Sequence, residues 1–246
     1  MSTIDTMMPL LKSLKMSGIA GTLDVRCRQA VEQQLSHLEF LNLVIQDEYE
    51  RRESKKLNQR LRRACFIGQK TLDNFRFDVS GLKLNKSLIF DLVTCKFIDE
   101  KCNVLIVGPT GVGKSHLAQA IGHSACLKGY DVLYLSATKL FKQLRAARAD
   151  NTLDKKIKSF ARYDLLVIDD LGLKSLQSPA DEDFHEIVCE RHEKCSTIIT
   201  SNLDFEEWGG IFPNQILASA TVDRLRDNAY RFVIEGESFR KPRPLV

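Results

Sequence analysis

The chain has 246 residues, of which 43% are hydrophobic and 28% charged, with 36 Lys and Arg against 32 Asp and Glu. This composition is ordinary for a protein with a hydrophobic core, built as one large domain or as a medium domain with a small one. No apolar run approaches the ~20 residues that span a bilayer, and no basic start precedes a long apolar stretch, so we expect no membrane span, no signal peptide and a cytoplasmic location.

The first 70 residues carry the excess of positive charge. They contain 12 Lys and Arg against 8 Asp and Glu, whereas residues 71–246 contain 24 of each. Apolar residues recur at helical spacing between residues 30 and 64, and no proline occurs between Pro9 and Pro109. We predict a helical N-terminal domain over residues 1–67 that contacts DNA or a partner, followed by a second domain over residues 68–246.

Four basic residues of this segment share one face of the expected helix: Arg52, Lys56, Arg60 and Arg63. Such a stripe can neutralise several backbone phosphates, and nothing beside it resembles a base-reading motif, so we expect largely non-specific binding of duplex DNA. The alternative is a solvated helix face, paired with Glu48 and its acidic neighbours.

From Cys102 onward, short apolar runs alternate with segments of helical pattern. Strands are expected at Val104–Val107, Val132–Leu135, Leu165–Ile168, Thr197–Thr200 and Arg231–Ile234. Helices are expected to begin at or near Lys114, Thr138, Thr152, Ser178 and Asn214. Ser178 is expected to cap its helix, with Pro179 in the first helical position. The alternation predicts an α/β fold with a five-stranded parallel sheet covered by helices, whose functional residues lie at the carboxyl ends of the strands.

The first strand leads into the sequence G-x-x-x-x-G-K-S, which is typical of a P-loop. The loop would turn tightly and direct backbone N–H groups at phosphate oxygens, and the N-terminus of the next helix would face the same phosphates. The predicted nucleotide-binding residues are Gly108, Pro109, Thr110, Gly111, Val112, Gly113, Lys114 and Ser115. Lys114 can reach the β- and γ-phosphates, and the Ser115 hydroxyl can ligate Mg²⁺. His116 can touch a phosphate or simply pack. The pattern predicts binding of a nucleoside triphosphate.

Polar residues follow two other strands. Asp169 and Asp170 end the run LLVIDD, and a carboxylate there is costly unless it meets a cation or hydrogen bonds. We expect Asp169 to share Mg²⁺ with Ser115 and Asp170 to orient the attacking water; the alternative is that either caps the next turn. Asn202 can bond the γ-phosphate and the water, or open an Asx-turn.

Arg224 lies near the end of the last expected helix, between Asp223 and Asp227. It is either a surface ion pair or an arginine finger that enters the site of a neighbouring subunit, in which case hydrolysis requires a multimer. The seven cysteines contain no C-x-x-C pair, and His185 and His192 do not form H-E-x-x-H. We therefore expect reduced thiols and no zinc peptidase site.

Several longer segments together resemble the IstB-like ATP-binding proteins, the helper ATPases of certain bacterial insertion sequences, and more distantly the DnaC-type helicase loaders. The resemblance rests on KTLDNFRF (70–77), NVLIVGPTGVGKSHLAQAIG (103–122), LLVIDDLG (165–172), TSNLDFEEWGGIF (200–212), TVDRLRDNAY (221–230) and VIEGESFR (233–240). It implies an AAA+ ATPase that binds duplex DNA with ATP, assembles as a multimer and assists a transposase. The implied roles are phosphate binding by Lys114, magnesium binding by Asp169, water activation by Asp170, sensing by Asn202, a finger at Arg224 and an adenine border at Phe75.

Two departures from the family pattern bear on activity. AAA+ enzymes usually carry Glu at the position of Asp170, so water activation is expected to be slow. The chain ends soon after the last expected strand, so we expect no C-terminal lid, and Arg240, Lys241 and Arg243 are the only late candidates for a sensor-two arginine. Two rival functions stay open: a DnaC-type loader of a replicative helicase, and a nucleotide-dependent switch that scarcely hydrolyses ATP.

Overall fold

The computed structural model describes residues 3–77, 83–236 and 238, and it divides the chain into two compact units, residues 1–59 and 60–246. The domain division expected after residue 67 stays a prediction. Among the described residues, every helix is too short or too polar to cross a membrane.

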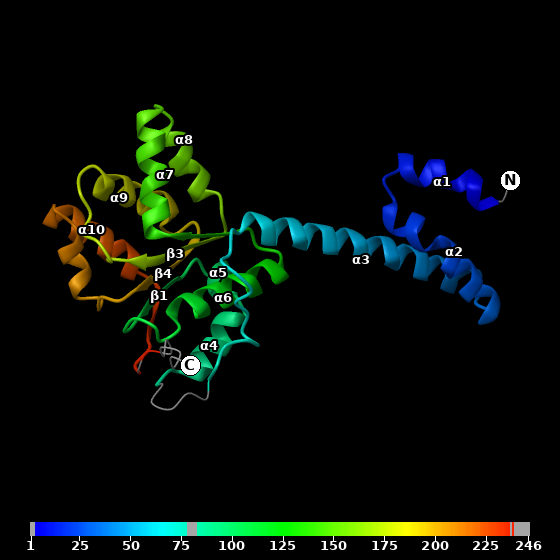
Figure 1. Ribbon diagram of the computed structural model, residues 1–246, viewed down its shortest axis with the longest axis horizontal. Helices are drawn as coiled ribbons and strands as arrows, with labels where there is room; N and C mark the ends of the chain where they lie inside the picture. Colours follow the sequence, from blue (N-terminus) through cyan, green and yellow to red (C-terminus); the bar gives the residue numbers. More distant parts are fainter. Residues whose placement is uncertain (1–2, 78–82, 237, 239–246) are drawn as a thin grey trace, which may run out of the picture. The chain divides into compact units, whose positions relative to one another are not determined.

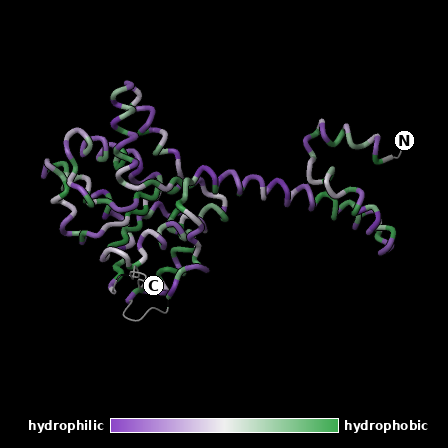
Figure 2. The backbone as a smooth tube through the Cα atoms, viewed as in Figure 1, coloured by the Kyte–Doolittle hydropathy of each residue, from purple (hydrophilic) through white to green (hydrophobic). Residues whose placement is uncertain are grey.

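The N-terminal unit is helical. It contains α1 (Thr3–Ser13), α2 (Ser17–Glu32) and the first part of α3 (His37–Arg63), which continues into the second unit. Its core is small and is made by Leu11, Ile19, Leu23 and Val44. Figure 2 shows that α3 becomes strongly hydrophilic in its second half, where its basic residues lie.

The second unit contains a five-stranded sheet: β1 (Asn103–Val107), β2 (Val132–Ser136), β3 (Leu165–Leu171), β4 (Ser196–Ser201) and β5 (Ala229–Val233). The strand order is β2-β3-β4-β1-β5, and all neighbouring strands are parallel (Figure 1). The central strands are almost entirely buried, and β1 and β3 are mostly apolar, as expected for a parallel sheet that helices cover on both faces. The predicted sheet is confirmed.

Helices cover the two faces of this sheet. α6 (Lys114–Lys128) packs on one face, with α4 (Lys86–Val93) against it; α5 (Lys96–Asp99) follows α4. On the other face lie α7 (Ala137–Ala149), α8 (Leu153–Ala161), α9 (Ala180–Arg191), η1 (Glu207–Ile211) and α10 (Gln215–Arg226) (Figure 1). The short helices α4, α5 and η1 were not predicted from the sequence.

The predicted cap of α9 is wrong. Pro179 occupies the N-cap position at φ −96°, the helix begins at Ala180, and no side chain caps it. The Ser178–Pro179 peptide is cis, and the Ala180 N–H donates to the Gln177 carbonyl oxygen at 2.7 Å. Ser178 therefore lies inside a turn that precedes the helix, where its hydroxyl is not placed to cap it.

Candidate functional site

The P-loop connects β1 to α6 and is held by glycines at positive φ. Gly111 has φ 90°, and a Cβ added there would lie 2.0 Å from the Ser238 Oγ atom. At Gly108, with φ 151°, the added Cβ would lie 2.2 Å from the Ile234 carbonyl oxygen. The chain that follows β5 thus lies directly against the P-loop, and these two positions admit only glycine.

Lys114 joins the P-loop to the end of β4. The side chain is 4% exposed, and its Nζ atom donates to the Gly108 carbonyl at 2.7 Å, the Pro109 carbonyl at 2.8 Å and Asn202 Oδ1 at 2.5 Å. The amide oxygen of Asn202 therefore faces the P-loop lysine rather than opening an Asx-turn. Two of the residues predicted for the site are thereby brought into contact, although they lie 88 positions apart in the sequence.

The acidic end of β3 is tied to both neighbouring strands. Asp169 is 4% exposed; its Oδ2 atom accepts from the Tyr134 hydroxyl and its Oδ1 atom from the Thr200 hydroxyl, each at 2.5 Å. Burial, and then the bond to Asp169, raise the pKa of Tyr134 far above its ordinary value, so its hydroxyl stays a donor. Asp169 is thus engaged within the sheet and does not cap the turn that follows.

Asp170 occupies an irregular point of the same strand. Its φ is 59°, and the register between β3 and β4 shifts between Ile168 and Leu171. Its backbone N–H donates to Thr200 Oγ1 at 2.9 Å, and its side chain is half-buried. Such a bulge re-aims a side chain at the end of a strand, which suits a residue that must reach into a site.

The oxygen donors that the sequence assigns to magnesium fit that ion. Ser115 is half-buried in the first turn of α6, and Asp169 presents a buried carboxylate with hydroxyl partners. Hydroxyl and carboxylate oxygens are ligands that Mg²⁺ accepts. Both remain predicted ligands.

His116 and Phe75 pack against each other beside the P-loop. Their ring centroids are 5.3 Å apart with the rings nearly perpendicular, and Phe75 is buried. The His116 Nε2 atom lies 2.9 Å from the Thr71 carbonyl oxygen. His116 is thus engaged with the segment before α4, and an adenine border at Phe75 stays a prediction.

Arg224 lies in the last turn of α10 and is half-buried. Its Nη1 atom donates to the Ala220 carbonyl of the same helix at 2.9 Å. Within the described residues it forms no ion pair with either flanking acid, since Asp227 instead meets His192, with 3.1 Å between Oδ2 and Nε2. The surface ion-pair alternative is therefore not what the structure contains, and the finger role stays a prediction.

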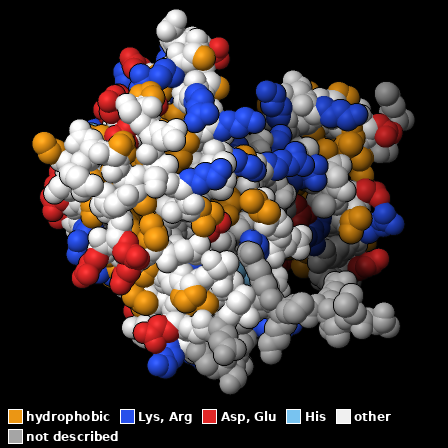
Figure 3. Space-filling model, turned by 60° about the vertical axis from the view of Figure 1, so that its left-hand side comes forward, with side chains coloured by type: hydrophobic (Ala, Val, Ile, Leu, Met, Phe, Trp, Pro, Cys, Tyr) orange, Lys and Arg blue, Asp and Glu red, His pale blue; other side chains and the backbone are white. Residues whose placement is uncertain are grey.

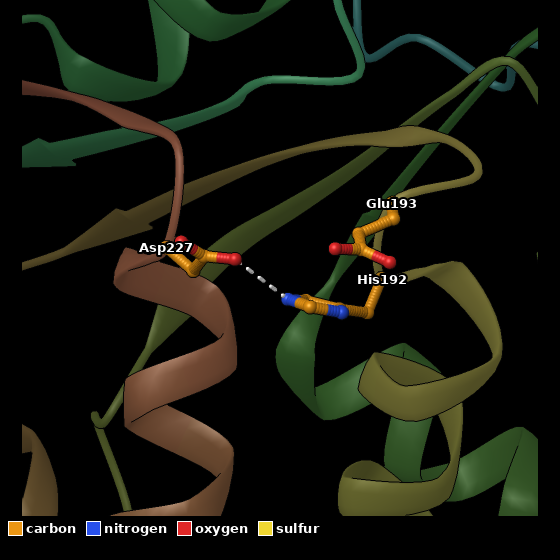
Figure 4. A group of neighbouring side chains, drawn as sticks. All are labelled: His192, Glu193 and Asp227. Atoms are coloured by element: carbon orange, nitrogen blue, oxygen red, sulfur yellow. Dashed lines mark hydrogen bonds and ion pairs between the residues drawn. The ribbon is translucent and has the colours of Figure 1, made fainter.

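His192, Glu193 and Asp227 place three donor atoms within 4.8 Å of one another (Figure 4). An imidazole and two carboxylates could hold a divalent cation in principle. However, Glu193 and Asp227 are exposed, and Arg224 and Arg226 line the same hollow as His192 and Asp227. Their positive charge opposes cation binding, so we assign no metal to this group.

The basic residues of α3 have mixed surroundings. Arg52 pairs with Glu48 and Lys56 with Glu53, each at 2.7 Å, as the solvated-face alternative expects. Arg63 is exposed and Arg60 half-buried, and neither forms an ion pair within the described part of the chain. A role for the four in DNA binding stays a prediction.

A basic cavity of about 1140 Å³ beside Asp170 was not predicted from the sequence. It lies between α7 and the loop before α9, and its cationic side chains are Lys142, Arg145, Arg148 and Lys174. All four are exposed, and only Arg148 has an ion-pair partner among the described residues, Asp183. Lys142, Arg145 and Arg148 recur at every third position of α7, and this spacing in the sequence could have predicted a basic face on that helix.

Comparison with known proteins finds similar sequences over nearly the whole chain. The model of the IstB-like ATP binding protein family matches residues 9–244. The chain is 34% identical to an insertion-sequence ATP-binding protein of Mycobacterium tuberculosis, covering 94% of this chain and 92% of the other, and 36% identical to one of Sinorhizobium fredii, covering 94% of each. The sequence resemblance to this family is confirmed.

Solved structures agree on the fold. A crystal structure of DnaI has a TM-score of 0.58 and 23% identity, covering 68% of this chain and 91% of that one. The DnaC helicase loader has a TM-score of 0.54 and 25% identity, covering 67% of this chain and 96% of that one. With the P-loop, the acidic strand end and the family match together, the chain belongs to the family of IstB-like ATP-binding proteins.

Proposed function

We propose that this ATP-binding AAA+ protein hydrolyses ATP and, as an ATP-bound multimer, binds duplex DNA on behalf of a transposase. The observation that carries the proposal is the contact of Lys114 with Asn202 beside the two acids of β3. The relatives named as insertion-sequence proteins support the transposition context.

Each residue of the site has a part in hydrolysis. Lys114, with its three oxygen partners, would exchange them for phosphate oxygens of ATP, and Asn202 would then be free to bond the γ-phosphate and the attacking water. Asp170 would orient that water. Magnesium, held by Ser115 and Asp169, would neutralise charge on the β- and γ-phosphates.

Binding of DNA would use the basic surfaces. The stripe Arg52, Lys56, Arg60 and Arg63 supplies four charges on one helix, and the cavity beside Asp170 supplies more. Figure 3 shows a group of Lys and Arg side chains in the upper middle of the visible face, with others scattered around it. Phosphate contacts of this kind bind DNA with little regard to sequence and weaken steeply with salt.

The direct test is fluorescence-anisotropy binding of random duplex DNA with ATP, with ADP and without nucleotide. We expect tight binding with ATP alone. Neutralising the four stripe residues should weaken binding and reduce the salt slope by roughly 0.9 for each DNA phosphate that the variant no longer neutralises, with ATP affinity unchanged. A charge-matched control neutralises exposed lysines elsewhere: Lys96, Lys101, Lys155 and Lys158. Equal weakening in the control, or joint loss of ATP binding, would contradict the DNA role of the stripe.

A second candidate function is loading of a replicative helicase. The likeness to the DnaC helicase loader favours it, because the same ATPase core would serve a protein partner. Absence of duplex binding in every nucleotide state, with capture of the host's replicative helicase in a pull-down, would decide for this candidate.

A further inference from the structure

We propose that Tyr134 and Thr200 are positioning residues for the magnesium-binding acid, and that Thr200 also couples this acid to Asp170. The inference rests on the proposed role of Asp169. It adds two hydroxyl groups to which the sequence analysis assigned no role.

The strand register places the three side chains on one face of the sheet. Tyr134 of β2 pairs with Val167 of β3, and Val167 with Ile198 of β4, so these residues point the same way. Asp169 and Thr200 each lie two residues further along their strands and keep that direction. On the opposite face of the sheet, Leu166 and Ile168 enter the core under α7 and α9. Tyr134, Asp169 and Thr200 therefore lie on the face that α6 covers, and α6 begins at the P-loop residue Lys114.

The two hydroxyls hold the Asp169 carboxylate from both sides. One donates to each oxygen, at 2.5 Å, and all three residues are at most 4% exposed. A carboxylate turns easily about its last torsion, but donors on different oxygens fix its plane. Each oxygen keeps a further lone pair, which is where a metal ion or its water would bind. The arrangement orients the acid without blocking it.

Thr200 also holds the strand irregularity at Asp170. A backbone N–H can only donate, so the Thr200 Oγ1 atom accepts the Asp170 N–H at 2.9 Å and still gives its own hydrogen to Asp169. One hydroxyl therefore links the acid that would bind magnesium to the acid that would orient water. Loss of this hydroxyl releases both.

A substitution at Tyr134 can remove the hydroxyl group while the packing of the ring is kept. Its ring lies 6.3 Å from that of Phe66, centroid to centroid, and Tyr134→Phe keeps this contact. A matched control exists at Tyr130, whose hydroxyl donates to Asp99 Oδ1 at 2.8 Å outside the nucleotide site. At Thr200, valine removes the hydroxyl at constant shape, whereas serine retains it.

The test measures binding of a fluorescent ATP analogue to the full chain, first in EDTA and then across a Mg²⁺ titration. For Tyr134→Phe and Thr200→Val we expect the Mg²⁺ concentration at half-effect to rise about 10- to 100-fold, the usual cost of losing an outer-shell partner. Affinity in EDTA should not change. Thr200→Ser and Tyr130→Phe should behave as wild type.

The outcomes separate this inference from the proposed function. If Mg²⁺ does not tighten nucleotide binding in the wild type, the assignment of Asp169 is wrong and both proposals fall. If Mg²⁺ acts on the wild type but Tyr134→Phe and Thr200→Val match Tyr130→Phe, only this inference is overturned. Circular dichroism checks folding, and Tyr134→Phe decides the matter should Thr200→Val unfold.

Discussion

The N-terminal unit offers a sharp test of close helix packing, because two glycines of α2 differ in their surroundings. A Cβ added at Gly18 would lie 2.6 Å from the Glu48 Cα atom and 2.7 Å from the Asp47 carbonyl oxygen, so α2 and α3 could not keep their spacing. At Gly21, an added Cβ meets nothing within 4 Å.

The magnitudes follow from these distances. Gly21→Ala should stabilise the unit by up to about 1 kcal/mol, the gain in helix propensity. Gly18→Ala gains the same at most, but overpacking costs about 1–3 kcal/mol. Moving the helices apart also weakens the bonds that the Gly18 and Ile19 N–H groups donate to Glu48 Oε2, at 2.7 and 3.2 Å. Hydrogen bonds to a charged group contribute roughly 1.5–3 kcal/mol each, so we expect a net loss of about 2–4 kcal/mol.

Native-state hydrogen exchange read by mass spectrometry suits this test, because it reports the free energy of opening for the segment 17–59 by itself. Protection there should fall in Gly18→Ala and rise slightly in Gly21→Ala, while peptides from the sheet stay unchanged. Equal effects of the two substitutions would refute the close approach of α2 to α3 at Gly18.

Three further predictions concern two residues of the site and the pH dependence of stability in the N-terminal unit. Asp170→Glu, whose side chain is one methylene longer, should raise ATP turnover roughly tenfold. An unchanged rate would show that Asp170 does not orient the attacking water. Fast turnover by the wild type would exclude the function of a switch that scarcely hydrolyses ATP. Arg224→Ala should lower turnover by at least about 100-fold and weaken multimers seen by light scattering, whereas Arg226→Ala on the same helix should do neither. The hydrogen bonds from Arg26 lower the pKa of Asp47 from 3.8 to about 2. Because the folded pKa lies below the ordinary one, the stabilisation is complete above about pH 4 and is lost as the pH falls toward 2. Asp47→Asn should therefore cost about 1 kcal/mol at pH 7 and less at pH 3 in urea denaturation, and an equal cost at both would contradict this origin.

Much of the second unit could be predicted from the sequence because its signals are local. An apolar run of strand length, then glycines at fixed spacing and a lysine, specifies strand, loop and helix start within about 20 residues. The alternation of strands and helices likewise predicted the parallel sheet. The prediction failed at Ser178, because the helix begins only at Ala180 and has no side-chain cap.

Tertiary structure alone decided which distant side chains meet. Nothing in the sequence assigned a role to Tyr134 or Thr200, and their side chains reach Asp169 only because β2 and β4 flank β3 in this register. The same holds for Ser238 against Gly111, which depends on where the chain runs after β5. Arg240, Lys241 and Arg243 lie outside the described residues. Hydrophobic periodicity is a pattern among residues close in sequence, so the sequence alone reveals it. Strand order and register depend on packing across the whole sheet, and they bring together the residues of the candidate site.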